Sequence, residues 1–501
     1  METQNAEAAS RLDTYILENT PQRIRDRYHS LSSYAKEHSF GELDEDVVVI
    51  DTETTGFSFN HDELIQIAAA RMVHGEIVGW YVTFVNPGKP IPEEVAHLTN
   101  ISDEDVANAP DPNTAVAGLV EFVGSSDVVA HNANFDRTFC TKYPTGEVLK
   151  QNCWIDSLDL AKIALPRLTS HRLLDLVRAF GGPDSTHRAD DDVAATCLVY
   201  RVLLAAVDTM PAPLLQHIAD MCDSDTWNTE RVFKCLAAMK ESEGPYSLRS
   251  SRKAAVAQAS APLRPDVNVP DSSPVGKELP PALSFATDAE ISEAFSVEGL
   301  LGSLYEEYEP REEQREMAFA VNRALATSRN LAVEAGTGVG KSMAYLVPLA
   351  LAAQKNGITV GVATKTNALL DQLVHKELPL LSKALGITYA PLKGFSHYPC
   401  LRKVDSLVNQ GPSVIHYRKQ EINQAPALAG LLSFVEQSDY DDMDALKIDY
   451  RAIPRWRIGT KSNECLRHKC PFFGRSCFVH GAREQAQRCD VVVTNHSLLF
   501  W

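Results

Sequence analysis

The chain has 501 residues, of which 44% are hydrophobic and 23% are charged. This composition is enough for two or three domains with buried cores, and it excludes a fibrous or wholly disordered protein. The formal net charge of −18 argues against a general affinity for polyanions, although a local basic surface can still bind one in a salt-sensitive way. The longest apolar run, residues 343–353, is too short to cross a bilayer, so we expect no membrane partner.

Residues 1–44 predict an irregular helical extension. They begin METQNAEAAS, which is too polar for a secretory signal peptide. We therefore expect a cytoplasmic protein whose ten cysteines do not form a disulfide framework.

Two short apolar stretches in residues 45–205 each lead into acidic residues. Residues 47–50 are β-branched, which predicts a buried strand, and Asp51 and Glu53 at its end point to the same side. Residues 127–130 predict a second buried strand, and Asp136 lies at the start of the helix expected after it. Further along, His187 and Asp192 precede the helical pattern of residues 193–204.

The convergence of these acids indicates a metal site. Four carboxylates at one point repel each other strongly unless divalent cations lie between them, and hard cations such as Mg2+ prefer carboxylate oxygens. Two metal ions held in this way suit phosphodiester hydrolysis. The alternative is helix capping, because Asp and Asn often satisfy free N–H groups at helix starts. The order of the three segments, each at a strand end or helix start, favours the metal site.

Residues 45–205 resemble a DnaQ-like exonuclease of the DEDDh type. The matching stretches are IDTETTG, IPEEVAHLTNISDEDV, AHNANFD, WIDSLDLAK and HRADDDVAAT. The resemblance implies an α/β fold with a ribonuclease H-like mixed sheet and removal of nucleotides from 3′ ends. It implies two Mg2+ or Mn2+ ions at a catalytic set made of Asp51, Glu53, Asp136 and Asp192, with His187 as the general base. The H-x4-D spacing selects Asp192, and no motif position departs from the pattern, so we expect an active site.

The middle of the chain predicts a connection between two domains. Residues 206–243 continue as a helical extension. Residues 244–290 predict a flexible linker, because residues 241–282 contain seven prolines, many Ser and Ala, and almost no aromatic residues.

The second half contains a phosphate-binding motif, EAGTGVGKS, at residues 334–342. We expect an apolar strand at residues 330–333 before it and a helix over residues 343–353 after it, which is the context of a phosphate-binding loop. Its glycines let backbone N–H groups approach phosphate, its lysine adds a positive charge, and its serine can hold Mg2+. The predicted nucleotide-binding residues are Gly336, Thr337, Gly338, Gly340, Lys341 and Ser342.

Residues 291–501 resemble the first motor domain of DinG-like helicases, which are relatives of XPD in superfamily two. Arg311 and Gln314, before the loop, resemble the adenine-reading motif, and GVATKTNALLDQL and CDVVVTNHSLLF resemble later segments. The resemblance implies ATP and a partial, RecA-like α/β domain with a cysteine-containing insert. The family's D-E-A-H box would follow shortly after Trp501, so we expect no ATP-driven unwinding from this chain alone. We therefore expect either a fragment or truncated product, or a chain that retains only the exonuclease and part of a DNA-binding platform.

Four cysteines in this half predict a metal site. They are Cys400, Cys465, Cys470 and Cys477, and clustered thiols without a secretory signal suggest metal. Their position resembles the iron–sulfur insert of DinG-like helicases, here around residues 395–480, which implies a 4Fe-4S cluster. Zinc is the alternative, because His468 and His480 are nearby and can replace a thiol. A site without metal is the third possibility.

The expected partners are a nucleotide and single-stranded or 3′-ended nucleic acid, with replication or repair proteins as further candidates. We expect DNA rather than RNA, although the 2′-hydroxyl is read by pocket details outside these motifs. A second class of function stays open, in which a DNA-binding or ATP-binding repair module uses the exonuclease as a recognition platform. Replacement of Asp51 by alanine distinguishes the two, because it abolishes cleavage only in the first.

Overall fold

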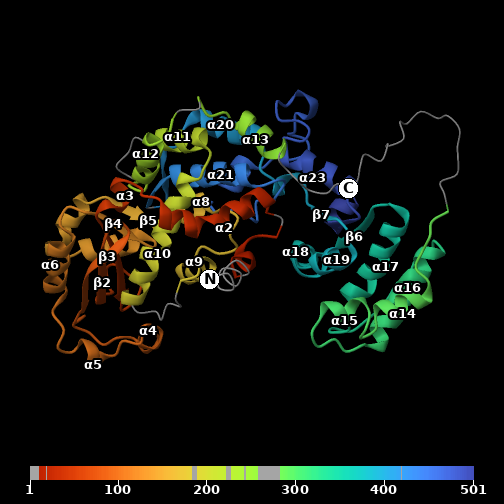
Figure 1. The fold of residues 1–501 in the computed structure, drawn as a ribbon, viewed down its shortest axis with the longest axis horizontal. Coiled ribbons are helices and arrows are strands. Elements are labelled where there is room, and N and C mark those ends of the chain that lie inside the picture. The colour runs from red at the N-terminus through yellow and green to blue at the C-terminus, as the bar shows by residue number, and fades with distance from the viewer. Residues whose placement is uncertain are drawn as a thin grey trace. The chain divides into compact units, whose positions relative to one another are not determined.

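The computed structural model describes residues 11–18, 20–182, 189–221, 227–241, 244–257, 282–418 and 420–500. The chain forms two compact units (Figure 1). Unit 1 contains residues 1–259, 403–439 and 443–458, and unit 2 contains residues 260–402, 440–442 and 459–501. Both units are discontinuous in sequence, whereas the domain ranges expected from the sequence are continuous.

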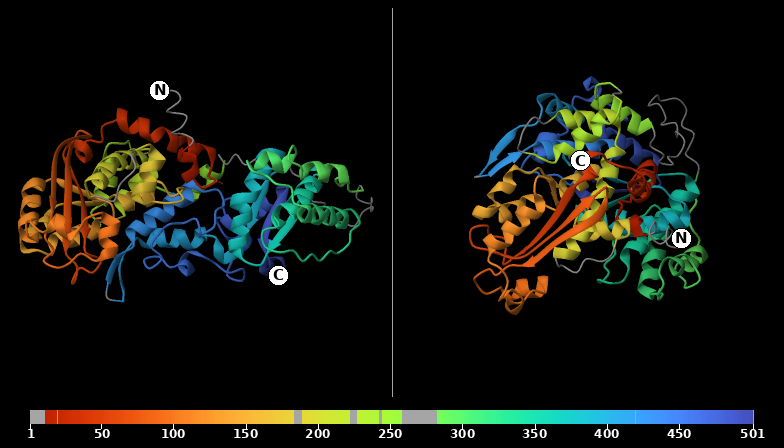
Figure 2. Two further views of the ribbon diagram at one scale, coloured as in Figure 1. Left: turned by 90° about the horizontal axis from the view of Figure 1, so that it is seen from below. Right: turned by 60° about the vertical axis from the view of Figure 1, so that its left-hand side comes forward.

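Unit 1 is built on a mixed sheet of five strands in the order β3-β2-β1-β4-β5. The strands are β1 (Val47–Thr54), β2 (Leu64–Val73), β3 (Glu76–Phe84), β4 (Asp127–Ala130) and β5 (Trp154–Asp156). β1 pairs antiparallel with β2 and parallel with β4. Helix α6 (Pro112–Val123) covers one face of the sheet and α10 (Ala189–Asp208) covers the other (Figure 2). This mixed sheet confirms the fold class predicted for this half of the chain.

Shorter helices complete the first part of unit 1. They are α2 (Gln22–Glu37), α3 (Glu42–Glu45), α4 (Glu93–Thr99), α5 (Asp103–Val106), α7 (Ala133–Thr141), η1 (Pro144–Gln151), α8 (Ser157–Ala164), α9 (Leu173–Phe180), α11 (Ala212–Asp220), α12 (Glu230–Ala238) and α13 (Leu248–Ala257). Among the described residues, no single helix is long and apolar enough to cross a membrane; α10 and α11, bent by 107°, meet those criteria of length and composition only as a pair.

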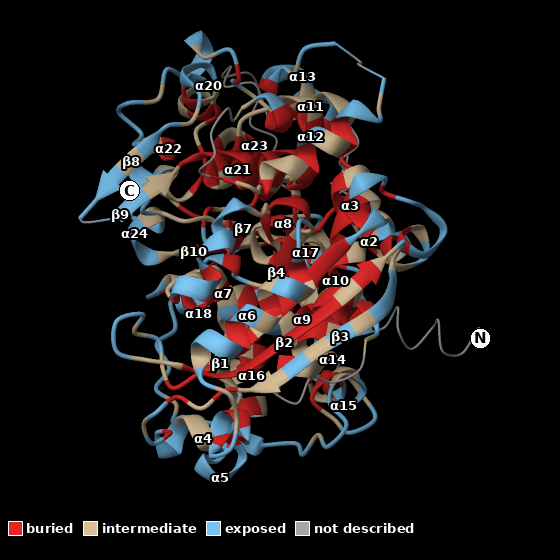
Figure 3. Ribbon diagram, turned by 90° about the vertical axis from the view of Figure 1, so that its left-hand side faces the viewer, coloured by how far each residue is buried: buried red, intermediate tan, exposed pale blue. Residues whose placement is uncertain are grey.

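A later part of the chain, residues 403–439 and 443–458, belongs to unit 1 and is called the docked segment. It contains most of α20 (Leu401–Gln410), the hairpin β8 (Val414–Tyr417) and β9 (Gln420–Asn423), α21 (Ala425–Gln437) and α22 (Arg455–Ile458). Almost every residue of α21 is buried, as Figure 3 shows. It packs beside α8, α11 and α13 (Figure 1). Helix α21 of the docked segment is therefore part of the core of unit 1, whereas the β8–β9 hairpin is largely exposed.

Helix α13 lies inside the range that the sequence predicts to be a flexible linker. Leu248, Arg252 and Ala255 on this helix are buried. The Arg252 guanidinium donates to the backbone carbonyls of Val435 and Ser438 at the end of α21. The expectation of a linker is wrong for residues 248–257, because composition cannot reveal that one face of this helix finds a partner in α21. Residues 258–281 lie outside the described part of the chain.

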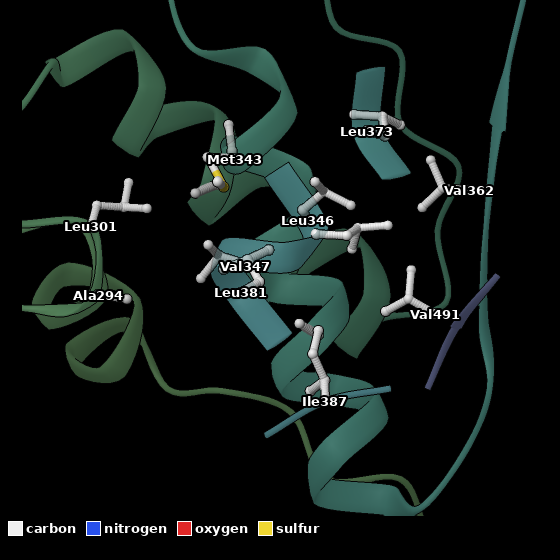
Figure 4. Packing of buried hydrophobic residues seen from close by; sticks show 14 of the residues in the cluster. Ala294, Leu301, Met343, Leu346, Val347, Val362, Leu373, Leu381, Ile387 and Val491 are labelled. Atoms are coloured by element: carbon white, nitrogen blue, oxygen red, sulfur yellow. The ribbon is translucent and has the colours of Figure 1, made fainter. Parts of the chain in front are cut away.

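Unit 2 has a parallel three-stranded sheet in the order β6-β10-β7. Its elements are α14 (Asp288–Ala294), α15 (Leu300–Leu304), α16 (Glu312–Ala326), α17 (Lys341–Asn356), β6 (Val360–Thr364), α18 (Asn367–Gln372), η2 (Leu373–Glu377), α19 (Leu378–Leu385), β7 (Tyr389–Leu392), η3 (Phe395–His397), η4 (Arg467–Lys469), α23 (Phe478–Arg488), β10 (Val491–Asn495) and α24 (His496–Leu499). Met343, Leu346 and Val347 of α17 belong to one buried hydrophobic cluster with Val362 and Val491 of the sheet, and Leu346 lies on the side of these two valines (Figure 4).

The strand expected at residues 330–333 is not formed. The described residues 329–336 have no β-ladder, and Leu331 and Val333 are exposed by 46% and 45%. Within the described sheet, β6 pairs only with β10. No described strand therefore forms hydrogen bonds with the backbone N–H and C=O groups of residues 330–333. The helix expected at residues 343–353 is present within α17.

Candidate active site

Strand β1 positions two of the predicted carboxylates. Asp51 lies opposite Ala68 of β2, and Glu53 lies opposite Gln66. Because successive side chains of a strand alternate between its faces, Asp51 and Glu53 share one side, as predicted. Both are half-buried, and the first four residues of the strand are fully buried and anchor this strand end.

The third carboxylate, Asp136, lies in the first turn of α7, after β4. It is only 2% exposed, so its polar atoms need partners within the protein. The hydroxyl of Thr52, between the two acids of β1, donates a hydrogen bond of 2.8 Å to Asp136 Oδ1. This bond ties α7 to the strand end that carries Asp51 and Glu53.

The fourth carboxylate, Asp192, lies in the first turn of α10. Ligand oxygens of Asp51, Glu53 and Asp192 all lie within 4.8 Å of one another. Asp136 adjoins this group, because it accepts the hydrogen bond from Thr52, the residue between Asp51 and Glu53 on β1. The structure therefore brings together acids from three separate segments of the sequence. The predicted general base, His187, lies outside the described residues.

Crowding of these acids changes their protonation. Burial raises the pKa of Asp51 well above its usual range, and the charges of Asp136, Glu53 and Asp192 raise it further. Burial, then Asp192 and Asp136, raise the pKa of Glu53 to about 8. Burial also raises the pKa of Asp136 to about 7, while the hydrogen bond from Thr52 acts in the opposite direction. Buried acidic oxygens that repel each other fit a divalent cation, whose charge would relieve this repulsion.

Two nearby features were not predicted from the sequence. His131, in the HNANFD motif, contacts Ser157 Oγ at 2.9 Å and the His171 carbonyl at 3.1 Å, and burial lowers its pKa to about 4. His131 thus joins the end of β4 to the start of α8 and to the loop before α9. Phe57 follows β1 with 85% of its surface exposed, and its ring lies 6.2 Å from that of Phe135 on α7. An aromatic residue directly after TTG was the available signal for this exposed ring.

The phosphate-binding loop of unit 2 precedes α17. Gly338 and Gly340 adopt φ values of 86° and 80°, which suit glycine. Gln314 Nε2 donates to the Gly340 carbonyl at 2.9 Å, and the Arg311 guanidinium donates to the Gly338 carbonyl. The structure therefore places the two residues of the adenine-reading motif against the loop. Lys341 Nζ donates to the carbonyls of Ala335 and Gly336 at the other end of the same loop.

The four predicted cysteine ligands line one small cavity in unit 2. Burial raises the pKa of Cys477, and the nearby Cys400 and Cys465 raise it further. His480 also lines the cavity, and its Nε2 lies 3.7 Å from Cys465 Sγ. The donor set therefore contains four thiols and one imidazole. Such a set suits an iron–sulfur cluster or a zinc ion.

A family comparison supports the assignment of the acidic site. Residues 48–200 match the family model described as RNase_T, Exonuclease. These residues form an exonuclease domain. The exonuclease domain includes β1 to β5 and all four clustered acids.

Over most of its length the chain is similar to a curated 3'-5' exonuclease, and over a smaller part it is similar to a DNA helicase. It is 30% identical over 468 residues to "3'-5' exonuclease DinG" of Bacillus subtilis (strain 168), which covers 90% of this chain and 47% of that protein. It is 37% identical over 211 residues to "ATP-dependent DNA helicase YoaA" of Escherichia coli (strain K12), covering 42% of this chain and 31% of that protein. The chain thus spans about half the length, or less, of these two curated relatives.

Among solved structures, the chain is similar to "Exonuclease X in complex with 5' overhanging duplex DNA". The identity is 25%, the TM-score is 0.26, and the match covers 32% of this chain and 90% of that chain.

Proposed function

We propose that this chain is a metal-dependent 3′-5′ exonuclease. The observation that carries the proposal is the approach of Asp51, Glu53 and Asp192 within 4.8 Å of one another, beside Asp136. These acids would hold two Mg2+ or Mn2+ ions, which polarise the scissile phosphate and activate water. His187, five residues before Asp192, would accept the proton of the attacking water.

The proposed substrate is single-stranded or 3′-ended nucleic acid, and DNA in preference to RNA. The relatives named above are a 3′-5′ exonuclease and a DNA helicase. The exposed ring of Phe57 beside the acids offers a surface on which a base can stack.

The decisive experiment is cleavage of single-stranded DNA labelled at its 3′ or 5′ end, with Mg2+ or Mn2+. Early release of the 3′ label as mononucleotide, with gradual shortening of the 5′-labelled strand, is the expected result. The Asp51→Ala variant should lose at least a thousand-fold in rate, because it removes an acid at the centre of the site. DNA binding without cleavage by the wild type would instead favour a recognition module.

We propose that unit 2 binds ATP through Gly336, Thr337, Gly338, Gly340, Lys341 and Ser342, with Arg311 and Gln314 at the adenine side. The contacts of Arg311 and Gln314 with the loop support this role. Binding of a fluorescent ATP analogue should be lost in Lys341→Ala, while Lys376→Ala, on the same unit but outside the loop, should bind as the wild type does.

We propose a 4Fe-4S cluster at Cys400, Cys465, Cys470 and Cys477, because all four line one cavity. Anaerobically purified protein should be brown with broad visible absorption, and Cys470→Ser should lose the colour while Cys235→Ser keeps it. A colourless protein with one equivalent of zinc would favour the alternative set, in which His480 supplies a ligand.

A further inference from the structure

A pocket of about 600 Å3 lies in unit 1 between the exonuclease domain and the docked segment. We propose that this pocket binds the substrate DNA strand on the 5′ side of the nucleotide that is removed. This inference rests on the proposed exonuclease function and assigns the docked segment a part in it. The volume lies within the usual range of ligand pockets and suits about one or two nucleotides.

The pocket adjoins the acidic site through two helices. Asn134 lines the pocket from α7 and lies two residues before Asp136 on the same helix. Asp156 accepts a hydrogen bond from the backbone N–H of Asn132 at 3.1 Å and caps α8, which carries the lining residue Lys162. The acids and the pocket thus share the N-terminal end of α7. We infer that a strand whose last phosphodiester lies at the acids continues into this pocket along α7.

Two ammonium groups from different parts of unit 1 line the pocket. Lys162 comes from α8 of the exonuclease domain, and Lys447 comes from the docked segment. Lys447 Nζ donates to the backbone carbonyl of Asp444. The charge of Lys162 acts to lower the pKa of the nearby carboxyls of Asp159 and Asp449. Cations on two walls of one pocket suit the phosphates of a strand that runs between them.

The acids that line the same pocket are already engaged. Asp449 forms an ion pair of 2.9 Å with Arg451, and Asp159 accepts a hydrogen bond of 3.1 Å from Trp227 Nε1. Glu421 lies 3.2 Å from the ring of His416. These partners reduce the repulsion that free carboxylates would exert on phosphate.

Neutral polar groups complete the lining. Asn134 faces the pocket from the exonuclease domain, and Gln420 and Asn423 face it from strand β9 of the docked segment. Amide side chains both donate and accept hydrogen bonds, so they can contact the edges of different bases without selecting one. The combination of cations and amides favours a DNA strand over a simple anion such as inorganic phosphate.

The test compares substrates with and without a 5′ strand. The p-nitrophenyl ester of thymidine 5′-monophosphate reports chemistry at the acids alone, and oligothymidylates from a dinucleotide to about twelve nucleotides add the strand. For the wild type, we expect kcat/KM to rise with length. In the Lys162→Ala/Lys447→Ala double variant, the loss on long oligonucleotides should exceed the loss on the ester by about 10-fold or more, mainly through KM. Lys36→Ala, outside the pocket, should behave as the wild type.

Salt dependence provides a second readout. The plot of log(1/KM) against log salt has a negative slope, and each lost phosphate contact should make it shallower by about 0.7 for a single strand. The double variant, which loses two contacts, should therefore have a slope shallower by about 1.4. Equal loss on ester and oligonucleotide, or an unchanged slope, would overturn the inference while the exonuclease proposal stands. A wild type that hydrolyses neither substrate would overturn the exonuclease proposal itself.

Discussion

The hydroxyl of Thr52 is a single polar contact on which the acidic site depends. It donates to the buried Asp136, and bonds from donors to charged groups contribute about 1.5–3 kcal/mol. Thr52→Val keeps the shape of the side chain but removes the donor, so the pKa of Asp136 should rise and the carboxylate should bind metal less well. We expect Mn2+ affinity to fall about 10-fold or more, as measured by calorimetry. High Mn2+ should restore most of the cleavage rate; a variant with unchanged affinity would show that the bond does not prepare the site.

The raised pKa values predict how stability depends on pH. Between about pH 4.5 and 8, the metal-free folded protein holds protons on Glu53 and its neighbours that the unfolded chain has released. The free energy of unfolding should therefore decrease as pH rises through this window. The contribution of Glu53 to this change in the free energy of unfolding is on the order of 2 kcal/mol. It is smaller than the full pKa shift implies, because the side chain is only half-buried and solvent screens its charge.

The Glu53→Gln variant isolates this contribution. Denaturant unfolding in EDTA should show a smaller loss of stability from pH 5 to pH 8 in the variant than in the wild type. Saturating Mg2+ should remove most of the loss in the wild type, because the cation stabilises the charged carboxylates. Identical pH profiles for both proteins in EDTA would contradict the proposed crowding of acids.

The sequence predicted most of the acidic site at the residue level. Alternation along a strand places Asp51 and Glu53 on one side whatever the rest of the fold does. The position of Asp136 followed from a strand-to-helix connection, and that of Asp192 from the start of the helical pattern of residues 193–204; both signals are local as well. The bond from Thr52 was not predictable, because it depends on the distance between β1 and α7. The exposure of Phe57 was missed for a related reason, since burial is a property of the assembled fold.

A substitution in helix α21 can test whether the docked segment and the exonuclease domain fold as one cooperative unit. Phe434 on α21 is fully buried, and the Arg167 guanidinium of the exonuclease domain lies 6.0 Å from its ring. Phe434→Ala should destabilise unit 1 by about 3–5 kcal/mol through the lost apolar contacts and the cavity left behind.

The measurement is hydrogen exchange of β1 and β4, which lie hundreds of residues away in sequence. Their protection should fall in Phe434→Ala, and it should not change in Phe473→Ala, whose residue is 37% exposed in unit 2. If the protection of β1 and β4 were the same in both variants, α21 would not contribute to the stability of the exonuclease core.

Helix α21 also shows which parts of the fold local sequence patterns could not predict. The elements with strong local patterns, such as β1, β4, α10 and α17, were predicted. The place of α21 was not, because its apolar residues fit a buried helix in either unit and only packing against α8 decides between them. The expected strand at residues 330–333 had the right composition, but a strand also needs a neighbour, and composition does not supply one.

Two compact units with different proposed ligands predict two separable responses of the whole molecule. The acids lie in unit 1 and the phosphate-binding loop lies in unit 2. A ligand that binds only the folded state raises stability by RT ln(1 + [L]/Kd), which is about 2.7 kcal/mol at a concentration of 100 Kd. Scanning calorimetry should therefore show one transition that Mn2+ moves to higher temperature and another that ADP moves.

Variants assign each transition to its unit. Asp51→Asn should abolish only the shift caused by Mn2+ and should keep the shift caused by ADP. Lys341→Ala should abolish the shift caused by ADP and should keep the shift caused by Mn2+. The experiment does not depend on catalysis, so it examines ligand binding even if one activity is absent. A single transition that both ligands move together would mean that the two units unfold as one cooperative body, since each ligand would then stabilise the whole chain.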